Sequence, residues 1–247
     1  MIAGTTRLVG LIGDPVAGSL SPRVQNAAFA ARGLDWAYVP LGVAAEDLTT
    51  AVAGLRALGF AGANVTIPHK HAAAALCDEL EPFAERAGSV NTLVVQGGRI
   101  YGSSTDAAAL GDIAVRRAVV LGAGGASRAL ATALEDAGVE VRVFSRRGAW
   151  PPDATGAELI ANATPVVDDP LVEPRRGQIV IDLPYRADGT PTALAETAER
   201  AGCTVVDGLE ALVRQGAASF ERWTGVPAPL DVMRRAVRDS RPSTLGA

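Results

Sequence analysis

The 247-residue chain contains very little lysine, histidine, asparagine and cysteine. Lys70 is the single lysine among 23 basic residues, and the only two histidines, His69 and His71, lie on either side of it. A genome that favours arginine codons explains why lysine is rare, but not why one lysine is kept at this position. Because arginine does not deprotonate in proteins, Lys70 is a candidate for transferring a proton.

Other absences exclude whole classes of function. No segment approaches the ~20 apolar residues that span a bilayer, and Leu8–Ile12 is too short for a secretory signal. The net charge of −4 argues against nucleic acid as the main partner, since phosphate binding needs a basic face. Cys77 and Cys203 form no metal-binding or redox spacing, so we expect buried thiols, no metal and a cytoplasmic location.

Strands and helices alternate along the sequence, which predicts an α/β fold with parallel sheets. The expected strands are 8–12, 36–41, 62–66, 90–95, 99–101, 118–121, 139–143, 159–161, 179–182 and 204–206. The expected helices start at Ser21 as N-cap, near Leu48 and at Pro68, and then cover the segment up to 137, 192–201, 209–223 and 230–238.

A glycine-rich turn follows the buried strand 118–121 and opens a helix that runs to about Ala137. Its sequence is Gly122-Ala123-Gly124-Gly125-Ala126-Ser127, with the small Ser127 at the third glycine position. Such glycines let the backbone approach a pyrophosphate at the positive end of the helix. In this strand–turn–helix context the motif predicts a dinucleotide site rather than a purely structural turn.

The end of the next strand indicates which dinucleotide is bound. An NAD enzyme has an acidic residue there for the ribose hydroxyl, whereas this chain has Ser145, Arg146 and Arg147. Two guanidinium groups suit the 2′-phosphate of NADP, and we prefer this reading to a solvated basic turn.

The segment 148–158, which connects this strand to the next, is unusually short. It contains Pro151 and Pro152 and leaves no room for a normal crossover helix, so we expect a shortened crossover and an exposed adenine side.

Two further polar segments lie where strands of the first half end. Residues 62–70 run from a strand into a predicted helix start, the usual ligand edge of an open α/β sheet. Ser19 and Ser21 follow the first strand, where their hydroxyls and free N–H groups could hold a carboxylate. If Ser21 is only an N-cap, however, it contributes to stability and not to binding.

Together these segments resemble the shikimate dehydrogenase family over nearly the whole chain, and all four asparagines fall inside them. The motifs are Ser19-Leu20-Ser21-Pro22 with Asn26, Asn64-Val65-Thr66-Ile67-Pro68-His69-Lys70, Val90-Asn91-Thr92, Thr105-Asp106, Gly122 to Arg128, Asn162-Ala163-Thr164, Tyr185, Asp207-Gly208-Leu209 and Gln215.

The resemblance implies a role for each matching residue. Lys70 and Asp106 would handle the proton, and Ser19, Ser21 and Tyr185 would hold the substrate carboxylate. The ring hydroxyls would be bound by Asn64, Thr66, Asn91, Asp106 and Gln215. The cofactor residues would be Gly122, Ala123, Gly124, Gly125, Ala126, Ser145, Arg146, Arg147, Asn162, Ala163, Thr164 and Gly208. Asn26 and Asn162 also fit structural hydrogen bonds, and we expect His69 and His71 on a helix surface.

The resemblance also implies a two-domain fold and a reaction. We expect a substrate-binding domain at 1–104, with a C-terminal helix at 226–247 packed back on it, and a Rossmann-like NADP domain at 105–225. The implied reaction is the NADPH-dependent reduction of 3-dehydroshikimate by a monomer or homodimer. Two serines at 19 and 21 favour shikimate over quinate, and the same chemistry on quinate or aminoshikimate is the alternative. The alternative of another class is a binding or regulatory protein that has lost catalysis.

Overall fold

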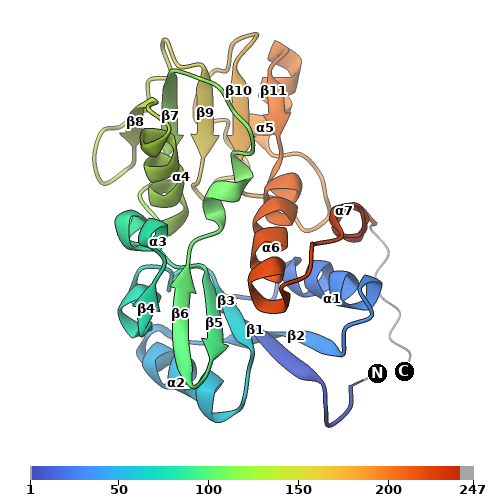
Figure 1. The fold of residues 1–247 in the computed structure, drawn as a ribbon. Helices are drawn as coiled ribbons and strands as arrows, with labels where there is room; N and C mark the ends of the chain where they lie inside the picture. The colour runs from blue at the N-terminus through green and yellow to red at the C-terminus, as the bar shows by residue number, and fades with distance from the viewer. Residues whose placement is uncertain (1, 240–247) are drawn as a thin grey trace.

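The chain forms two α/β units, each built around one sheet (Figure 1), in a computed structural model that describes residues 2–239. The first sheet has the order β2-β1-β3-β5-β6-β4 and is mixed. Its strands are β1 (Arg7–Gly13), β2 (Trp36–Gly42), β3 (Gly62–Val65), β4 (Glu79–Leu80), β5 (Thr92–Gln96) and β6 (Arg99–Ser103). The helices of this half are α1 (Ser21–Ala31), α2 (Leu48–Ala57) and α3 (Pro82–Ala87).

The second sheet is entirely parallel, with the order β11-β10-β9-β7-β8. Its strands are β7 (Arg117–Leu121), β8 (Glu140–Phe144), β9 (Leu159–Asn162), β10 (Ile179–Asp182) and β11 (Thr204–Val206). The helices that follow β7 in the sequence are α4 (Gly125–Asp136), α5 (Ala193–Ala201), α6 (Gly208–Thr224) and α7 (Leu230–Arg238). The predicted α/β class with two sheets is confirmed. None of the helices in residues 2–239 is both long and apolar enough to cross a membrane.

The strands predicted at 90–95 and 99–101 form an antiparallel hairpin, and the predicted short crossover is confirmed. Gly97 and Gly98 join β5 to β6 with φ values of 58° and 74°, the left-handed conformation that such tight turns require. Between β8 and β9, residues 145–158 form turns and no helix. β8 is the edge strand of the second sheet, and Val143 in it is 47% exposed.

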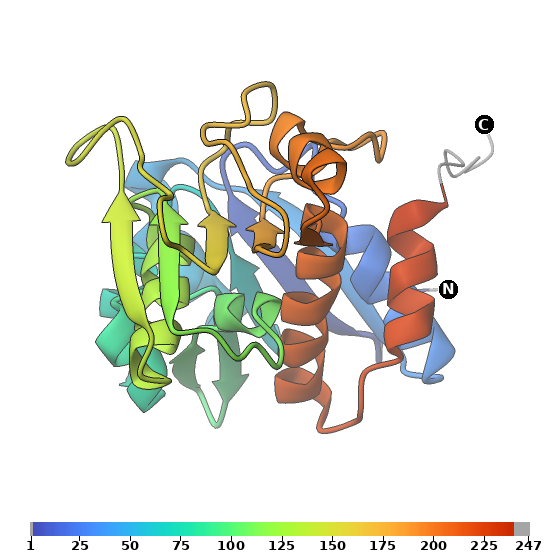
Figure 2. The ribbon, with the colours of Figure 1, turned by 90° about the horizontal axis from the view of Figure 1, so that it is seen from above.

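Helix α6 connects the two units. Its side chains Phe220 and Trp223 are buried in a core with β1, α1 and α7 of the first unit, while Ala211 packs in the core of the second. Figure 2 shows α6, α1 and α7 side by side over the first sheet. Although α6 lies within the segment 105–225 that was expected to form the NADP domain, its C-terminal part packs in the core of the first unit. Of the predicted C-terminal helix, 240–247 lie outside the described residues.

Three local predictions are wrong. No α-helix starts at Pro68, because the carbonyl of Lys70 accepts a hydrogen bond from the Val90 N–H and only a 3-10 helix, Ala72–Leu76, follows. Ser21 is not an N-cap: that position is Leu20, and it has no side-chain cap. His69 is not on a surface; it is 2% exposed, and its Nε2 lies 2.7 Å from the Val43 carbonyl oxygen.

The two thiols also differ from expectation, since Cys77 and Cys203 are only partly buried. In addition, the sequence pattern gave no sign of β4 and α3, which are both short.

We predict that Phe220→Ala destabilises the protein by about 3–5 kcal/mol, the usual cost of removing a buried aromatic ring. Phe220 is fully buried, and its ring centroid lies 5.4 Å from that of Phe29. Urea unfolding measures the change. The matched control is Leu58→Ala, at a site 74% exposed, which should change stability by no more than about 0.5 kcal/mol. Equal effects of the two substitutions would contradict the role of α6 in the core.

Candidate active site

A cleft of about 600 Å³ lies between the two units. The second sheet lines it with the segments that follow three of its strands, namely 123–126, 163–165 and 183–185. The first unit contributes Thr66 and Lys70, and α6 contributes Gln215. A smaller cavity of about 80 Å³ adjoins this cleft, because Thr66, Lys70 and Gln215 line both. The strand ends thus form one continuous site, as expected for open α/β sheets.

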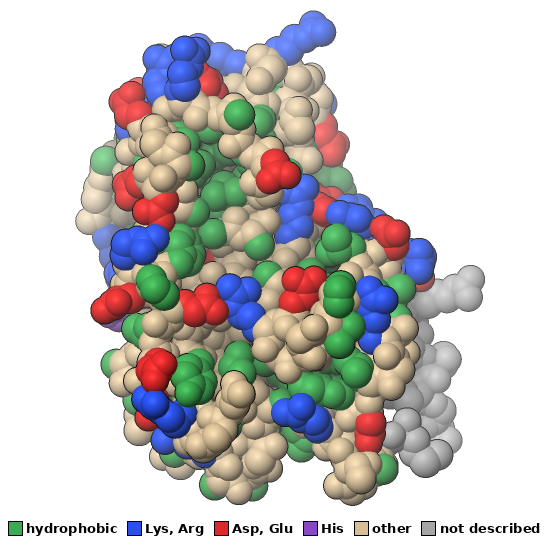
Figure 3. Space-filling model, viewed as in Figure 1, with side chains coloured by type: hydrophobic (Ala, Val, Ile, Leu, Met, Phe, Trp, Pro, Cys, Tyr) green, Lys and Arg blue, Asp and Glu red, His purple; other side chains and the backbone are tan. Residues whose placement is uncertain are grey.

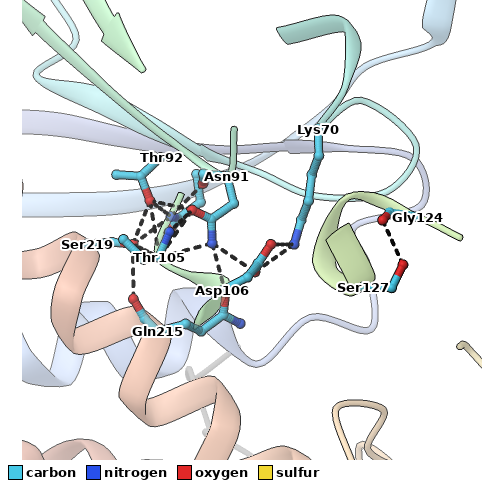
Figure 4. Close-up of polar contacts among 10 residues, drawn as sticks. Lys70, Asn91, Thr92, Thr105, Asp106, Gly124, Ser127, Gln215 and Ser219 are labelled. Atoms are coloured by element: carbon cyan, nitrogen blue, oxygen red, sulfur yellow. Dashed lines mark hydrogen bonds and ion pairs between the residues drawn. The ribbon is translucent and has the colours of Figure 1, made fainter. Parts of the chain in front are cut away.

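Lys70 and Asp106 form an ion pair where the two cavities meet. The Lys70 Nζ lies 2.8 and 2.7 Å from the two carboxylate oxygens of Asp106. The side chains are only 14% and 4% exposed, so the pair is shielded from water. Figure 4 shows Lys70 reaching across to Asp106 beside the start of α4. The structure therefore joins the two residues predicted to handle a proton.

Asn91 fixes the orientation of this pair. Its Nδ2 donates to Asp106 Oδ1 at 2.9 Å and lies 3.1 Å from Gln215 Oε1. Its Oδ1 accepts from the Thr105 backbone N–H at 2.7 Å. Because Asn91 is 2% exposed and satisfied on both sides of its amide, it holds Asp106 in one position.

A second layer of hydroxyl groups supports Asn91, as Figure 4 also shows. Ser219 Oγ lies 2.8 Å from Thr92 Oγ1 and 3.1 Å from Thr105 Oγ1. Asn64 Nδ2 donates to Ser219 at 3.0 Å, and Asn64 Oδ1 accepts from the Tyr38 hydroxyl at 2.8 Å.

Neither Ser219 nor Tyr38 was predicted as part of the site. Both lie among core residues, on α6 and β2, so an apolar pattern hides them. Burial raises the pKa of the Tyr38 hydroxyl well above its usual value, against a smaller opposing effect of a hydrogen bond with Ser21.

The predicted carboxylate residues gather at the start of α1. Ser19 and Ser21 line the smaller cavity, and the Ser21 N–H donates to Ser19 Oγ at 3.2 Å. The Leu20 N–H donates to the Tyr185 hydroxyl at 3.2 Å, although 165 positions separate them in the sequence. Tyr185 thus reaches from the second unit to the start of α1, where the positive end of the helix dipole favours an anion.

The glycine-rich turn lies at the other side of the cleft. Gly122 has φ +126°, and a Cβ there would lie 3.0 Å from the Ala163 carbonyl oxygen, so glycine is needed. Gly124 faces open space. At Gly125 a Cβ would lie 2.8 Å from the Cβ of Lys70, which shows how closely α4 approaches the ion pair.

The predicted cofactor residues do not all line the cleft. Ala123, Gly124, Gly125, Ala126, Arg147, Ala163, Thr164 and Gly208 line it. Gly122, Ser145, Arg146 and Asn162 are not among the lining residues. Arg146 instead lies over the Trp150 ring, 5.9 Å from its centroid, and Asn162 is fully buried. Arg128, which was not predicted, lines the cleft and contacts His71 Nδ1 at 3.2 Å.

These features define a two-domain, dinucleotide-dependent oxidoreductase with an ion-paired lysine beside the cofactor turn. Two family models, the shikimate dehydrogenase substrate binding domain and the shikimate 5′-dehydrogenase C-terminal domain, match residues 11–93 and 208–238. The shikimate dehydrogenase (NADP(+)) of Moorella thermoacetica is 39% identical over 288 positions, covering 99% of this chain and 97% of that protein. The chain belongs to the shikimate dehydrogenase family.

Solved structures agree with this membership. Shikimate dehydrogenase from Aquifex aeolicus superposes with a TM-score of 0.88 at 32% identity, covering 97% of this chain and 100% of that one. Shikimate 5-dehydrogenase from Thermus thermophilus, solved in complex with NADP(H) and shikimate, gives a TM-score of 0.83 at 35% identity, covering 95% and 100%. The 288 positions aligned with the Moorella protein outnumber the 247 residues of this chain, so this chain carries deletions.

We predict that Ser21→Ala raises the KM for shikimate about tenfold, as expected when one hydrogen bond to a charged group is lost. Because the Ser21 hydroxyl does not cap α1, the melting temperature should stay close to that of the parent. Steady-state kinetics and thermal unfolding measure the two effects. Asp207→Ala is a positive control for unfolding, since Asp207 does cap α6 through the Glu210 N–H at 2.7 Å. An unchanged KM would show that Ser21 does not bind substrate.

Proposed function

We propose that this protein reduces the ring ketone of 3-dehydroshikimate with NADPH to give shikimate, and catalyses the reverse reaction. One observation carries the proposal: the Lys70–Asp106 ion pair lies in the same cleft as the glycine-rich start of α4. This arrangement brings a proton-transfer group next to a dinucleotide site. We also propose that the protein acts in the cytoplasm as a monomer or homodimer.

The residues of the second unit fit NADP. The N-terminus of α4 presents free N–H groups beside Gly124, where no atom blocks the approach of a pyrophosphate. Arg147 lines the same cleft and supplies a guanidinium group for the 2′-phosphate. When bound, NADPH supplies the hydride for the ketone carbon.

The chain's own residues bind the ring and move the proton. Ser19, Ser21 and Tyr185 hold the carboxylate at the start of α1, and Asn64, Thr66 and Gln215 bind ring hydroxyls. This places the ketone oxygen within reach of Lys70 Nζ. As the carbonyl oxygen gains negative charge, Lys70 gives it a proton. The Asp106 carboxylate stabilises the ammonium form of Lys70, and a proton from solvent restores that form after the step. In the oxidation direction Lys70 takes the hydroxyl proton.

NADP⁺ reduction, compared across shikimate, quinate and aminoshikimate, tests the substrate. The two serines at 19 and 21 favour shikimate over quinate. A faster reaction with quinate or aminoshikimate would show that this other compound is the substrate. The alternative of a catalytically weak binding or regulatory protein predicts binding of NADP⁺ and shikimate in calorimetry without turnover. Retention of both members of the ion pair argues against that alternative.

We predict that Lys70→Arg lowers kcat by ~10²–10⁴, the usual effect of losing a general acid–base group. The charge at Asp106 is still neutralised in this variant, so affinities for shikimate and NADP⁺ should stay within a few-fold of the parent. Stopped-flow measurement of NADPH oxidation gives kcat, and calorimetry gives the affinities. A kcat within tenfold of the parent would show that Lys70 only orients the substrate and that water or Asp106 carries the proton.

We also predict that Arg147→Ala weakens binding of NADP⁺ at least tenfold and leaves NAD⁺ binding nearly unchanged, because one charge-assisted contact to the 2′-phosphate is lost. Arg146→Ala is the matched variant. It tests whether the arginine over Trp150 reads the phosphate as well. Calorimetric titration with both dinucleotides distinguishes the cases. If Arg147→Ala weakens both cofactors equally, that residue does not read the phosphate.

A further inference from the structure

A fully buried carboxylate lies at the end of β10, outside the set of residues assigned above. Asp182 has no exposed surface, and neither has Asn162, its register partner at the end of β9. Asn162 Nδ2 donates to Asp182 Oδ1 at 2.8 Å, and the Thr192 hydroxyl donates to the other carboxylate oxygen. A buried carboxylate that accepts two hydrogen bonds is held in one position and can fix the neighbouring backbone.

The network continues from Asn162 into the cleft. Asn162 Oδ1 accepts from the Thr164 backbone N–H at 2.9 Å and from the Thr164 hydroxyl at 2.7 Å. Thr164 itself lines the cleft. The amide of Asn162 can therefore hold the turn at Thr164 only while its nitrogen points to Asp182. Asp182 fixes which way this amide faces.

Asp182 also directly precedes a segment on the other wall of the cleft. The next three residues, 183–185, line it, and Tyr185 accepts the hydrogen bond from the α1 start. The Leu183 N–H donates to the Asn162 carbonyl oxygen at 2.9 Å, so the segments after β9 and β10 are bonded to each other. Asp182 thus directly precedes the cleft-lining segment 183–185 and is connected through Asn162 to the cleft-lining segment 163–165.

We propose that Asp182 is a positioning residue that acts through Asn162 and Thr164 to hold the segments 163–165 and 183–185 in the geometry that binds the cofactor and substrate. This inference rests on the proposed function for its kinetic test. Its binding test needs only NADP⁺.

The charge of Asp182 opposes folding. Burial raises the pKa of this carboxyl to about 6; hydrogen bonds from Thr192 and Asn162 lower it, and the carboxylate of Asp207, itself paired with Arg238, raises it. Since the folded pKa lies above the unfolded value of about 3.9, stability falls as the pH rises between these values and stays lower above them.

The test substitutes Asp182→Asn, which keeps the shape and removes the charge. We expect the Kd for NADP⁺ at pH 8 to rise about tenfold, the difference between a charge-assisted and a neutral hydrogen bond. The Tm at pH 8 should be equal to that of the parent or higher. In the parent, NADP⁺ affinity and kcat/KM should both fall below about pH 6, and the substitution should remove that dependence.

Asp188→Asn is the matched control. Asp188 is exposed, and its carboxylate accepts a hydrogen bond from the Thr190 hydroxyl at 2.7 Å. The same change there should alter neither NADP⁺ binding nor the pH dependence of that binding. A double substitution of Asp182→Asn with Thr164→Val should be less than additive in NADP⁺ affinity, because both act on Asn162.

Two results would overturn the inference. One is NADP⁺ binding by Asp182→Asn that equals the parent from pH 5 to 8. The other is a loss of binding matched by a lower Tm at pH 8, which would make Asp182 a structural residue. If the parent binds NADP⁺ but oxidises no NADPH with 3-dehydroshikimate, the proposed function fails while the binding comparison still decides the role of Asp182.

Discussion

The architecture of this protein depends on keeping one ion pair, Lys70–Asp106, buried and correctly oriented. A buried charged pair is favourable only if its remaining hydrogen-bonding groups are satisfied. Asn91 supplies the contact to Asp106, Thr105 fixes Asn91, and Ser219 in turn contacts Thr105. Lys70 follows β3 and Asp106 follows β6, so both charged residues lie at the same edge of the first sheet.

The second unit and α6 complete the site around this pair. Helix α4 begins so close to Lys70 that only glycine fits at position 125. Helix α6 carries Gln215 and Ser219 to the same place and anchors itself through its buried aromatic residues in the first core. On the face shown in Figure 3, acidic and basic side chains are interspersed.

Much of this could be predicted from the sequence, because strong local signals mark it. Alternating apolar residues gave nearly every strand, breakers gave the last helix as Leu230–Arg238, and the prolines at 151 and 152 excluded a crossover helix. Prediction failed where a distant contact overrides a local preference. The Val90 N–H donates to the Lys70 carbonyl oxygen, which a helix starting at Pro68 would need for its own hydrogen bonds. His69 is buried, and its Nε2 contacts the Val43 carbonyl oxygen. Tyr38, Ser219 and Asp182 could not be found because their partners lie far along the chain or their strands look like ordinary core.

The single lysine allows the central claim to be tested at one atom. Protein labelled with [¹⁵Nζ]lysine should give one side-chain signal, from Lys70. If the ion pair is buried in the substrate site, this ammonium resonance should exchange slowly with water, and it should shift both in Asp106→Asn and on titration with shikimate. A resonance with the shift and fast exchange of a free lysine, unchanged by either treatment, would contradict the account.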